Sequence, residues 1–351
     1  MGERTGLGDI PSLDGWRAVA VSIVFVAHAG WGDIVPGGLG VTIFFFLSGY
    51  LITTLMLKEF SKKSTIDLSH FYIRRGLRLF PPLTIVLTLA YILTAAGWLD
   101  GHASIQGYFA QLLYFSNYYQ LFFNSGGGIP TGTAVYWSLA VEEHFYFLFP
   151  VAFLFFLAKR PPSKTLYLLY SFCALELIWR LVLIAGQHAS WERTYYASDT
   201  RMDSIVFGCA LAFIMNARMG KEWLERDLTR RILVIAGLAG LLISVGWRSE
   251  DFRNIWRYSI QGLSLTPLFY YSVTKPESRL FSALNTRLMK KIGVYSYSIY
   301  LTHLIIISNL KLALTHAVLV AVASAAISLL LAWVIDRFID QPLQKVRLRF
   351  R

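Results

Sequence analysis

The sequence predicts an all-α protein, a polytopic transmembrane helical bundle of about ten spans. Of the 351 residues, 55% are hydrophobic and only 15% are charged, against about 25% charged in ordinary soluble domains. Aromatic residues make up 15%, as suits a bilayer protein with anchors at the interfaces. A helix needs about 20 mostly apolar residues to cross a bilayer. Ten such stretches lie near 12–31, 38–57, 79–98, 137–158, 165–186, 200–217, 231–247, 256–274, 292–310 and 317–336.

Connections rich in Lys and Arg alternate along the chain with connections that contain few. Basic clusters follow every second apolar stretch, whereas 98–137 contains neither Lys nor Arg. Because cytoplasmic loops carry the excess of these residues, the pattern predicts that both termini are cytoplasmic. A further apolar stretch, 107–123, fits this alternation only if it does not cross completely. We therefore interpret 99–136 as an external, re-entrant or interfacial excursion within a single transmembrane domain, 1–351.

The net charge is explained by membrane topology. The formal value is +12, which in a soluble protein would suggest nucleic acid. Here the basic residues lie between apolar segments, so we expect contact with membrane lipids and no nucleic-acid partner, with binding of an anionic donor as a second use. Cys173 and Cys209 both lie inside apolar stretches. Two such cysteines suggest neither a disulfide framework nor a metal site.

Ionisable residues are costly in lipid and often mark function. Arg17 and His28 are eleven residues apart, close to three helical turns, so they share one face of the first span, roughly 16 Å apart. A histidine can take a proton from a hydroxyl and return it to a leaving group. His28 is therefore a candidate catalytic base. A structural histidine beside a snorkelling arginine would show the same spacing.

Two adjacent carboxylates, Glu142 and Glu143, begin the apolar stretch 137–158. A carboxylate commonly orients a catalytic imidazole, so one of them could orient or activate His28. Adjacent helical residues point about 100° apart, so we expect only one to face that partner. Solvation of both carboxylates at the external interface is the alternative.

An arginine cluster, Arg74, Arg75 and Arg78, marks the cytoplasmic entrance of the third span. Spacings of three and four place pairs of them on one helical face, and guanidinium groups bind phosphate oxygens in bidentate fashion. The cluster could dock an anionic cofactor, or anchor the helix to anionic lipid. Ser48 follows a glycine-rich stretch and could offer a hydroxyl to a ligand or serve close helix packing.

Several other polar or aromatic residues form either an acceptor site or a structural polar seam. In the stretch 200–217, an ion pair with another helix would explain the charged residues at its start. In the stretch 292–310, hydroxyl and imidazole groups recur on one helical face and could hold neighbouring helices together. The residues are Asn117, Trp137, Ser138, Arg201, Asp203, Tyr300 and His303.

Taken together and in this order, these segments resemble the acyltransferase 3 family of membrane acyltransferases over nearly the whole chain. The matching motifs are Arg17 with His28, SGYL at 48–51, RxxR at 75–78, WSLxxEE at 137–143, Arg-x-Asp at 201–203 and Tyr-Leu-x-His at 300–303. Two positions depart from the common pattern. Thr42 stands where many members carry a charged residue, and His144 stands where many have glutamine.

The resemblance implies an acyl-CoA co-substrate, usually acetyl-CoA, and no tightly bound cofactor. It implies an acceptor hydroxyl on a surface polysaccharide, lipopolysaccharide or glycolipid, and a multi-pass protein of the bacterial cytoplasmic membrane. The donor would contact Arg17, Ser48 and the arginine cluster, and its thioester would reach His28. His28 would then either remove the proton of the acceptor hydroxyl or take the acyl group itself. The rival interpretation is a transporter or flippase of a polar or glycan substrate, because buried Arg, His and Glu also form proton relays.

Overall fold

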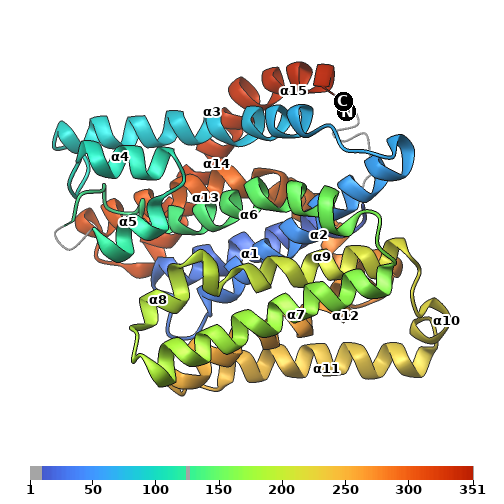
Figure 1. The fold of residues 1–351 in the computed structure, drawn as a ribbon. Coiled ribbons are helices and arrows are strands. Elements are labelled where there is room, and N and C mark those ends of the chain that lie inside the picture. Colours follow the sequence, from blue (N-terminus) through green and yellow to red (C-terminus); the bar gives the residue numbers. More distant parts are fainter. Residues whose placement is uncertain (1–9, 124–126, 351) are drawn as a thin grey trace.

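The computed structural model describes residues 10–123 and 127–350, so residues 124–126 of the predicted excursion lie outside it. Within these ranges every regular element is a helix, which confirms the all-α class (Figure 1). Each of the ten apolar stretches overlaps a long helix. These helices are α1 (Leu13–Val26), α2 (Gly37–Lys63), α3 (Leu68–Ala95), α6 (Trp137–Ala152), α7 (Pro162–Leu181), α9 (Met202–Asn216), α11 (Asp227–Gly246), α12 (Arg257–Thr274), α13 (Arg287–Ala313) and α14 (Ala317–Ile335).

Six helices are long and apolar enough to cross a membrane, judged by length and composition within the described residues: α2, α3, α6, α7, α11 and α14, some with short extensions. The outermost of them expose large apolar side chains, such as Leu242 on α11 and Val318 on α14, which are 74% and 66% exposed. Lipid is the environment in which such surfaces are stable. The protein is therefore a multi-pass membrane protein, and the count of ten spans stays a prediction.

The centre of the bundle is the crossing of α2 and α9, which two glycines make possible. A Cβ atom at Gly49 would lie 1.9 Å from the carbonyl oxygen of Ile205, and one at Gly208 would lie 1.9 Å from that of Phe46. Each helix therefore places a glycine against the other helix's backbone, the close approach that small residues permit in membranes. The SGYL motif thus has a packing role, at Gly49.

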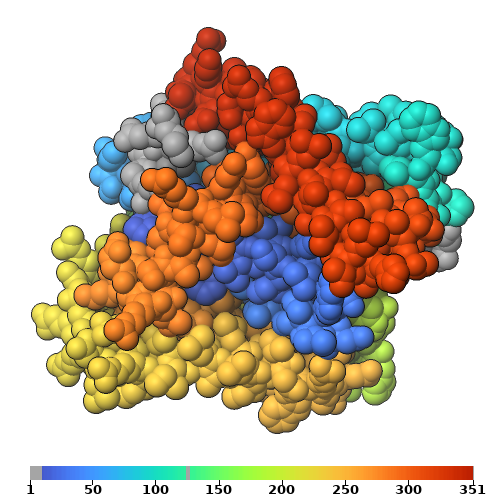
Figure 2. All heavy atoms as spheres, turned by 180° about the vertical axis from the view of Figure 1, so that it is seen from behind, coloured from blue at the N-terminus to red at the C-terminus, as the bar shows by residue number. Residues whose placement is uncertain are grey.

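Helix α1 lies against α2, α12 and α13. The indole of Trp16 donates a hydrogen bond of 2.9 Å to the Ser272 hydroxyl of α12. At Gly293 of α13, a Cβ atom would lie 1.9 Å from the carbonyl oxygen of Asp14, so α1 and α13 also touch through backbone. From behind, blue atoms of the N-terminal segment are visible between the yellow atoms around α11 and the orange and red atoms of α13 and α14 (Figure 2). α1 therefore links the two sides of the bundle.

The predicted excursion folds as two short helices, α4 (Ile105–Leu112) and α5 (Ser116–Phe122). With eight and seven residues, neither approaches the length needed to cross a bilayer. Buried amides attach both to the bundle. Gln111 accepts a hydrogen bond of 3.2 Å from the hydroxyl of Tyr91 on α3, and Asn117 donates to the carbonyl oxygen of Tyr196 and the hydroxyl of Ser198.

The basic connections gather at one end of the bundle. The α2–α3 connection and the short helix α10 (Lys221–Leu224) lie at the right of Figure 1, and the C-terminal helix α15 (Gln341–Arg347) lies at the top, above the right-hand part of α3. Helices α4, α5 and α8 (Trp191–Tyr196) lie at the opposite end (Figure 1). This arrangement agrees with the alternation of Lys- and Arg-rich connections in the sequence.

Candidate active site

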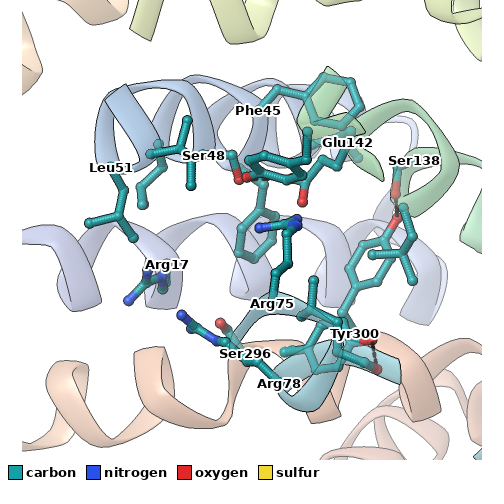
Figure 3. Close-up of a pocket in the computed structure, with 18 of the residues that line it drawn as sticks. Arg17, Phe45, Ser48, Leu51, Arg75, Arg78, Ser138, Glu142, Ser296 and Tyr300 are labelled. Carbon is teal, nitrogen blue, oxygen red and sulfur yellow. Dashed lines mark hydrogen bonds between the residues drawn. The ribbon is translucent and has the colours of Figure 1, made fainter. Parts of the chain in front are cut away.

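A cavity of about 160 Å³ lies between α1, α2, α3, α6 and α13 (Figure 3). This volume is below the roughly 300 Å³ at which pockets for drug-sized ligands begin, so the cavity suits a narrow chain rather than a whole nucleotide. It contains seven of the residues singled out from the sequence: Arg17, Ser48, Arg75, Arg78, Ser138, Glu142 and Tyr300. Five separate helices supply them, so only the tertiary fold brings them together.

Three guanidinium groups lie together along one part of the cavity (Figure 3). Arg17 pairs with Asp14 at 2.6 Å, one helical turn away. Arg75 pairs with Glu143 at 2.6 Å and stacks 3.0 Å above the ring centroid of Tyr146. Arg78 is exposed and has neither a hydrogen bond nor an ion pair within the part of the chain that the structure describes. Arg78 is therefore a guanidinium available to an anionic ligand.

The two adjacent carboxylates diverge, as the helical geometry predicted. Glu142 accepts a hydrogen bond of 3.0 Å from the hydroxyl of Ser48 and lines the cavity. Glu143 faces α3, where it accepts three hydrogen bonds from Arg75. Both carboxylates therefore bind side chains of neighbouring helices, Glu142 that of Ser48 on α2 and Glu143 that of Arg75 on α3. Neither contacts His28, contrary to the prediction.

The expected partnership of His28 with a glutamate is replaced by a pair of histidines. His28 Nδ1 lies 2.9 Å from His303 Nε2, and the two rings stack with centroids 5.2 Å apart. His303 can be this partner because α1 and α13 pack with their backbones in contact at Gly293. His28 itself lies in a π-helical turn, Ala27–Trp31, and is half-buried, whereas His303 is fully buried.

The histidine pair lies just beyond the far end of the cavity. Neither histidine lines the cavity, but Tyr300 does, and its ring centroid is 5.5 Å from that of His303. The Tyr300 hydroxyl lies 2.6 Å from the hydroxyl of Ser138 (Figure 3). The cavity thus extends from the arginines to the hydroxyl pair of Ser138 and Tyr300, and the ring of Tyr300 lies between that end of the cavity and the ring of His303.

Arg74 is the one member of the predicted arginine cluster that lies outside the cavity. Its guanidinium pairs with Glu59 of α2 at 3.6 Å and donates to the carbonyl oxygen of Phe350 at 2.5 Å. Arg74 and Arg78 are four residues apart and begin on one helical face, so it is their partners that separate them: Arg74 is held by Glu59 and the C-terminal segment, whereas Arg78 lines the cavity together with Arg75.

The other predicted polar residues divide between two buried clusters. Arg201 lies 3.8 Å from the ring centroid of Tyr258 and 5.5 Å from that of Trp137, and its Nε atom has no hydrogen-bond partner among the described residues. Asp203 forms the expected ion pair with another helix, at 2.7 Å from Arg180 of α7. Arg180 was not among the residues singled out from the sequence, although Glu176 and Arg180 stand four residues apart inside an apolar stretch.

The comparisons with known proteins agree with the motifs. Residues 10–337 match the family model described as the acyltransferase domain, that of acyltransferase 3. The chain belongs to the acyltransferase 3 family.

The names of two relatives describe O-acetyl transfer. The peptidoglycan O-acetyltransferase OatA of Listeria monocytogenes is 30% identical over 350 residues, which cover 96% of this chain and 56% of the relative. The O-acetyltransferase OatA of Staphylococcus aureus is 31% identical over 359 residues, which cover 96% of this chain and 57% of the relative. The chain thus spans a little over half the length of these relatives. No solved structure matches it.

Proposed function

We propose that this protein is an integral membrane O-acyltransferase that moves an acyl group, acetyl in the simplest case, from cytoplasmic acyl-CoA to a hydroxyl of an extracytoplasmic glycan. The observation that carries the proposal is the narrow cavity that connects three guanidinium groups with Tyr300, whose ring lies beside that of His303, the partner of His28. In this proposal the chain crosses the bacterial cytoplasmic membrane ten times, with both termini in the cytoplasm.

The donor enters from the end where the basic connections gather. Coenzyme A carries phosphates on a nucleotide and a thin pantetheine arm that ends in the thiol. A cavity of about 160 Å³ has room for part of that arm only, so the nucleotide remains at the mouth. There Arg78 and Arg17 contact the phosphates through charge-assisted hydrogen bonds. Glu143 keeps Arg75 in the cavity wall.

The thioester then reaches the Ser138–Tyr300 end of the cavity. His28 removes the proton of the acceptor hydroxyl while the hydroxyl oxygen attacks the thioester carbonyl carbon. The carbon–sulfur bond breaks, and the departing thiolate takes the proton from the imidazolium. One ester and one free thiol result, and the base returns to its neutral form. A positioned general base contributes typically about 10²–10⁴-fold to the rate.

The acceptor approaches from the opposite end of the bundle. His28 is half-buried, and its carbonyl oxygen accepts a hydrogen bond from Lys311 in the last turn of α13. His28 also lies eleven residues beyond Arg17 along the first span. The name of the Listeria relative specifies peptidoglycan. We therefore propose a glycan of the cell envelope as the acceptor class.

Acetyl transfer by the purified chain in lipid nanodiscs tests this function, with radiolabelled acetyl-CoA as the donor and soluble peptidoglycan fragments as the acceptor probe. His28→Ala should reduce transfer by about 10²–10⁴-fold with unchanged affinity for coenzyme A. His316→Ala, at an exposed histidine in the α13–α14 connection, is the matched control and should retain wild-type transfer. Wild-type transfer by His28→Ala would refute the assignment of the base. Wild-type protein that does not bind coenzyme A would favour the transporter.

A further inference from the structure

We infer that His303 is a positioning residue whose Nε2 atom holds His28 in the tautomer that leaves the Nε2 atom of His28 free to act as the base. The inference rests on the proposed role of His28 and adds the group that prepares it. It follows from three hydrogen bonds, taken in order from α13 to α1.

The first step concerns His303 and its own helix. Its Nδ1 atom lies 2.8 Å from the carbonyl oxygen of Tyr300 and 3.2 Å from that of Ile299. A carbonyl oxygen can only accept a hydrogen bond, so Nδ1 of His303 must carry the hydrogen. A neutral imidazole has a single N–H group. The Nε2 atom of His303 therefore has a free lone pair and can only accept.

The second step transfers this constraint to His28. Its Nδ1 atom lies 2.9 Å from the Nε2 atom of His303, and a hydrogen bond between two nitrogens needs one hydrogen. Since His303 Nε2 has none, His28 Nδ1 carries it and donates. The neutral His28 ring then has a free lone pair on Nε2, which makes no hydrogen bond with any residue in the described ranges.

The neutral state of the pair follows from its surroundings. His303 is fully buried, and a buried charge is costly unless it is paired. No carboxylate contacts either ring within the described part of the chain. The hydrogen bonds therefore all run in one direction: His28 Nδ1–H donates to His303 Nε2, and His303 Nδ1–H donates to backbone carbonyl oxygens of α13.

This arrangement does for His28 what a buried carboxylate does in other acid–base sites, because it fixes the tautomer and the orientation of the ring. It differs in that the partner is neutral. A neutral acceptor adds no negative charge to an apolar region, and its direction is set by backbone carbonyls that cannot donate. His303 thus stands on α13 where its N–H group faces a backbone carbonyl oxygen and its acceptor nitrogen faces His28.

Two amide substitutions that differ by one methylene group test the inference. In His303→Gln the side-chain oxygen can reach the position of the imidazole Nε2 atom and accept from His28. In His303→Asn the amide ends near the position of Nδ1 and cannot reach His28. We expect His303→Asn to lose at least about tenfold in kcat, within the 10²–10⁴-fold that a base supplies, with the KM for acetyl-CoA unchanged. His303→Gln should recover most of that loss.

Equal kcat values for the two amide variants, at unchanged KM, would overturn the inference. A double variant, His28→Ala with His303→Asn, should be no slower than His28→Ala alone, and a further loss would assign His303 a different role. Wild-type transfer by His28→Ala would instead reject the proposed base.

A measurement on the wild-type protein keeps the inference testable if the variants do not fold. Solid-state NMR of ¹⁵N-histidine-labelled protein in lipid reads the protonation of each ring nitrogen, with His28 assigned by its absence from the spectrum of His28→Ala. We expect hydrogen on Nδ1 of His28 and none on Nε2. The opposite tautomer would overturn the inference whatever the activity of the variants.

Discussion

Replacing Arg78 by glutamine should selectively weaken binding of the phosphate-bearing part of the donor. Arg78 lines the cavity and has no ion pair or hydrogen bond in the described residues, so Arg78→Gln removes no native ion pair and should leave the fold stable. A hydrogen bond to a charged group contributes about 1.5–3 kcal/mol. At 1.4 kcal/mol for each tenfold in affinity, the Kd for coenzyme A should rise roughly 10- to 150-fold.

The same helix provides the matched control. Arg74 stands one turn before Arg78 but lies outside the cavity, paired with Glu59 at 3.6 Å. Its side chain is 27% exposed, so Arg74→Gln should lower the free energy of unfolding by about 0.2–1 kcal/mol, as for other ion pairs near the surface. Its affinity for coenzyme A should match that of the wild type.

Calorimetric titration of the purified variants in nanodiscs measures both effects, and a second ligand separates charge from shape. Pantetheine lacks the phosphates, so Arg78→Gln and the wild type should bind it equally. Added salt should weaken binding of coenzyme A to the wild type more than to Arg78→Gln, because salt screens the lost interaction. An unchanged Kd for coenzyme A in Arg78→Gln, or an equal loss in Arg74→Gln, would refute the assignment of the cavity mouth.

Three further predictions concern stability. Gly49→Ala should lower the thermal midpoint in detergent, because its Cβ atom would lie 1.9 Å from a backbone oxygen of α9; Gly76→Ala, with no atom within 4 Å, should not, and equal midpoints would contradict the close packing. Arg180→Met should destabilise by about 3–5 kcal/mol because it leaves Asp203 buried without its partner; the double variant with Asp203→Asn should recover part of this, and no recovery would contradict the pairing. Burial raises the pKa of Asp199, in the α8–α9 connection, but hydrogen bonds from an arginine and a tryptophan hold it below its usual range. Its stabilising effect is therefore present above the ordinary Asp pKa of about 4 and is lost as pH falls through the lower folded value. Asp199→Asn should therefore have a lower free energy of unfolding than the wild type at neutral pH, and this difference should shrink as the pH is lowered. A difference in unfolding free energy that stays constant with pH would contradict this.

Much of the candidate site could be predicted from the sequence because ionisable residues are conspicuous in apolar segments. Arg17 and Glu142 were singled out on that ground, and both line one cavity in the structure. Arg180 was missed although it has the same signal, a charge inside an apolar stretch. It forms a structural ion pair with Asp203, so the same signal also marks residues that hold helices together.

The order of apolar and basic segments by itself determined the helical class and the grouping of basic connections at one end, because each depends only on composition along the chain. Partnerships between side chains were decided by the tertiary structure. His28 pairs with His303, 275 residues away, and Glu143 pairs with Arg75. Periodicity tells which residues share a face of a helix. Which neighbouring helix that face meets depends on how the helices cross, and here glycine contacts such as those of Gly49 and Gly293 set the crossings.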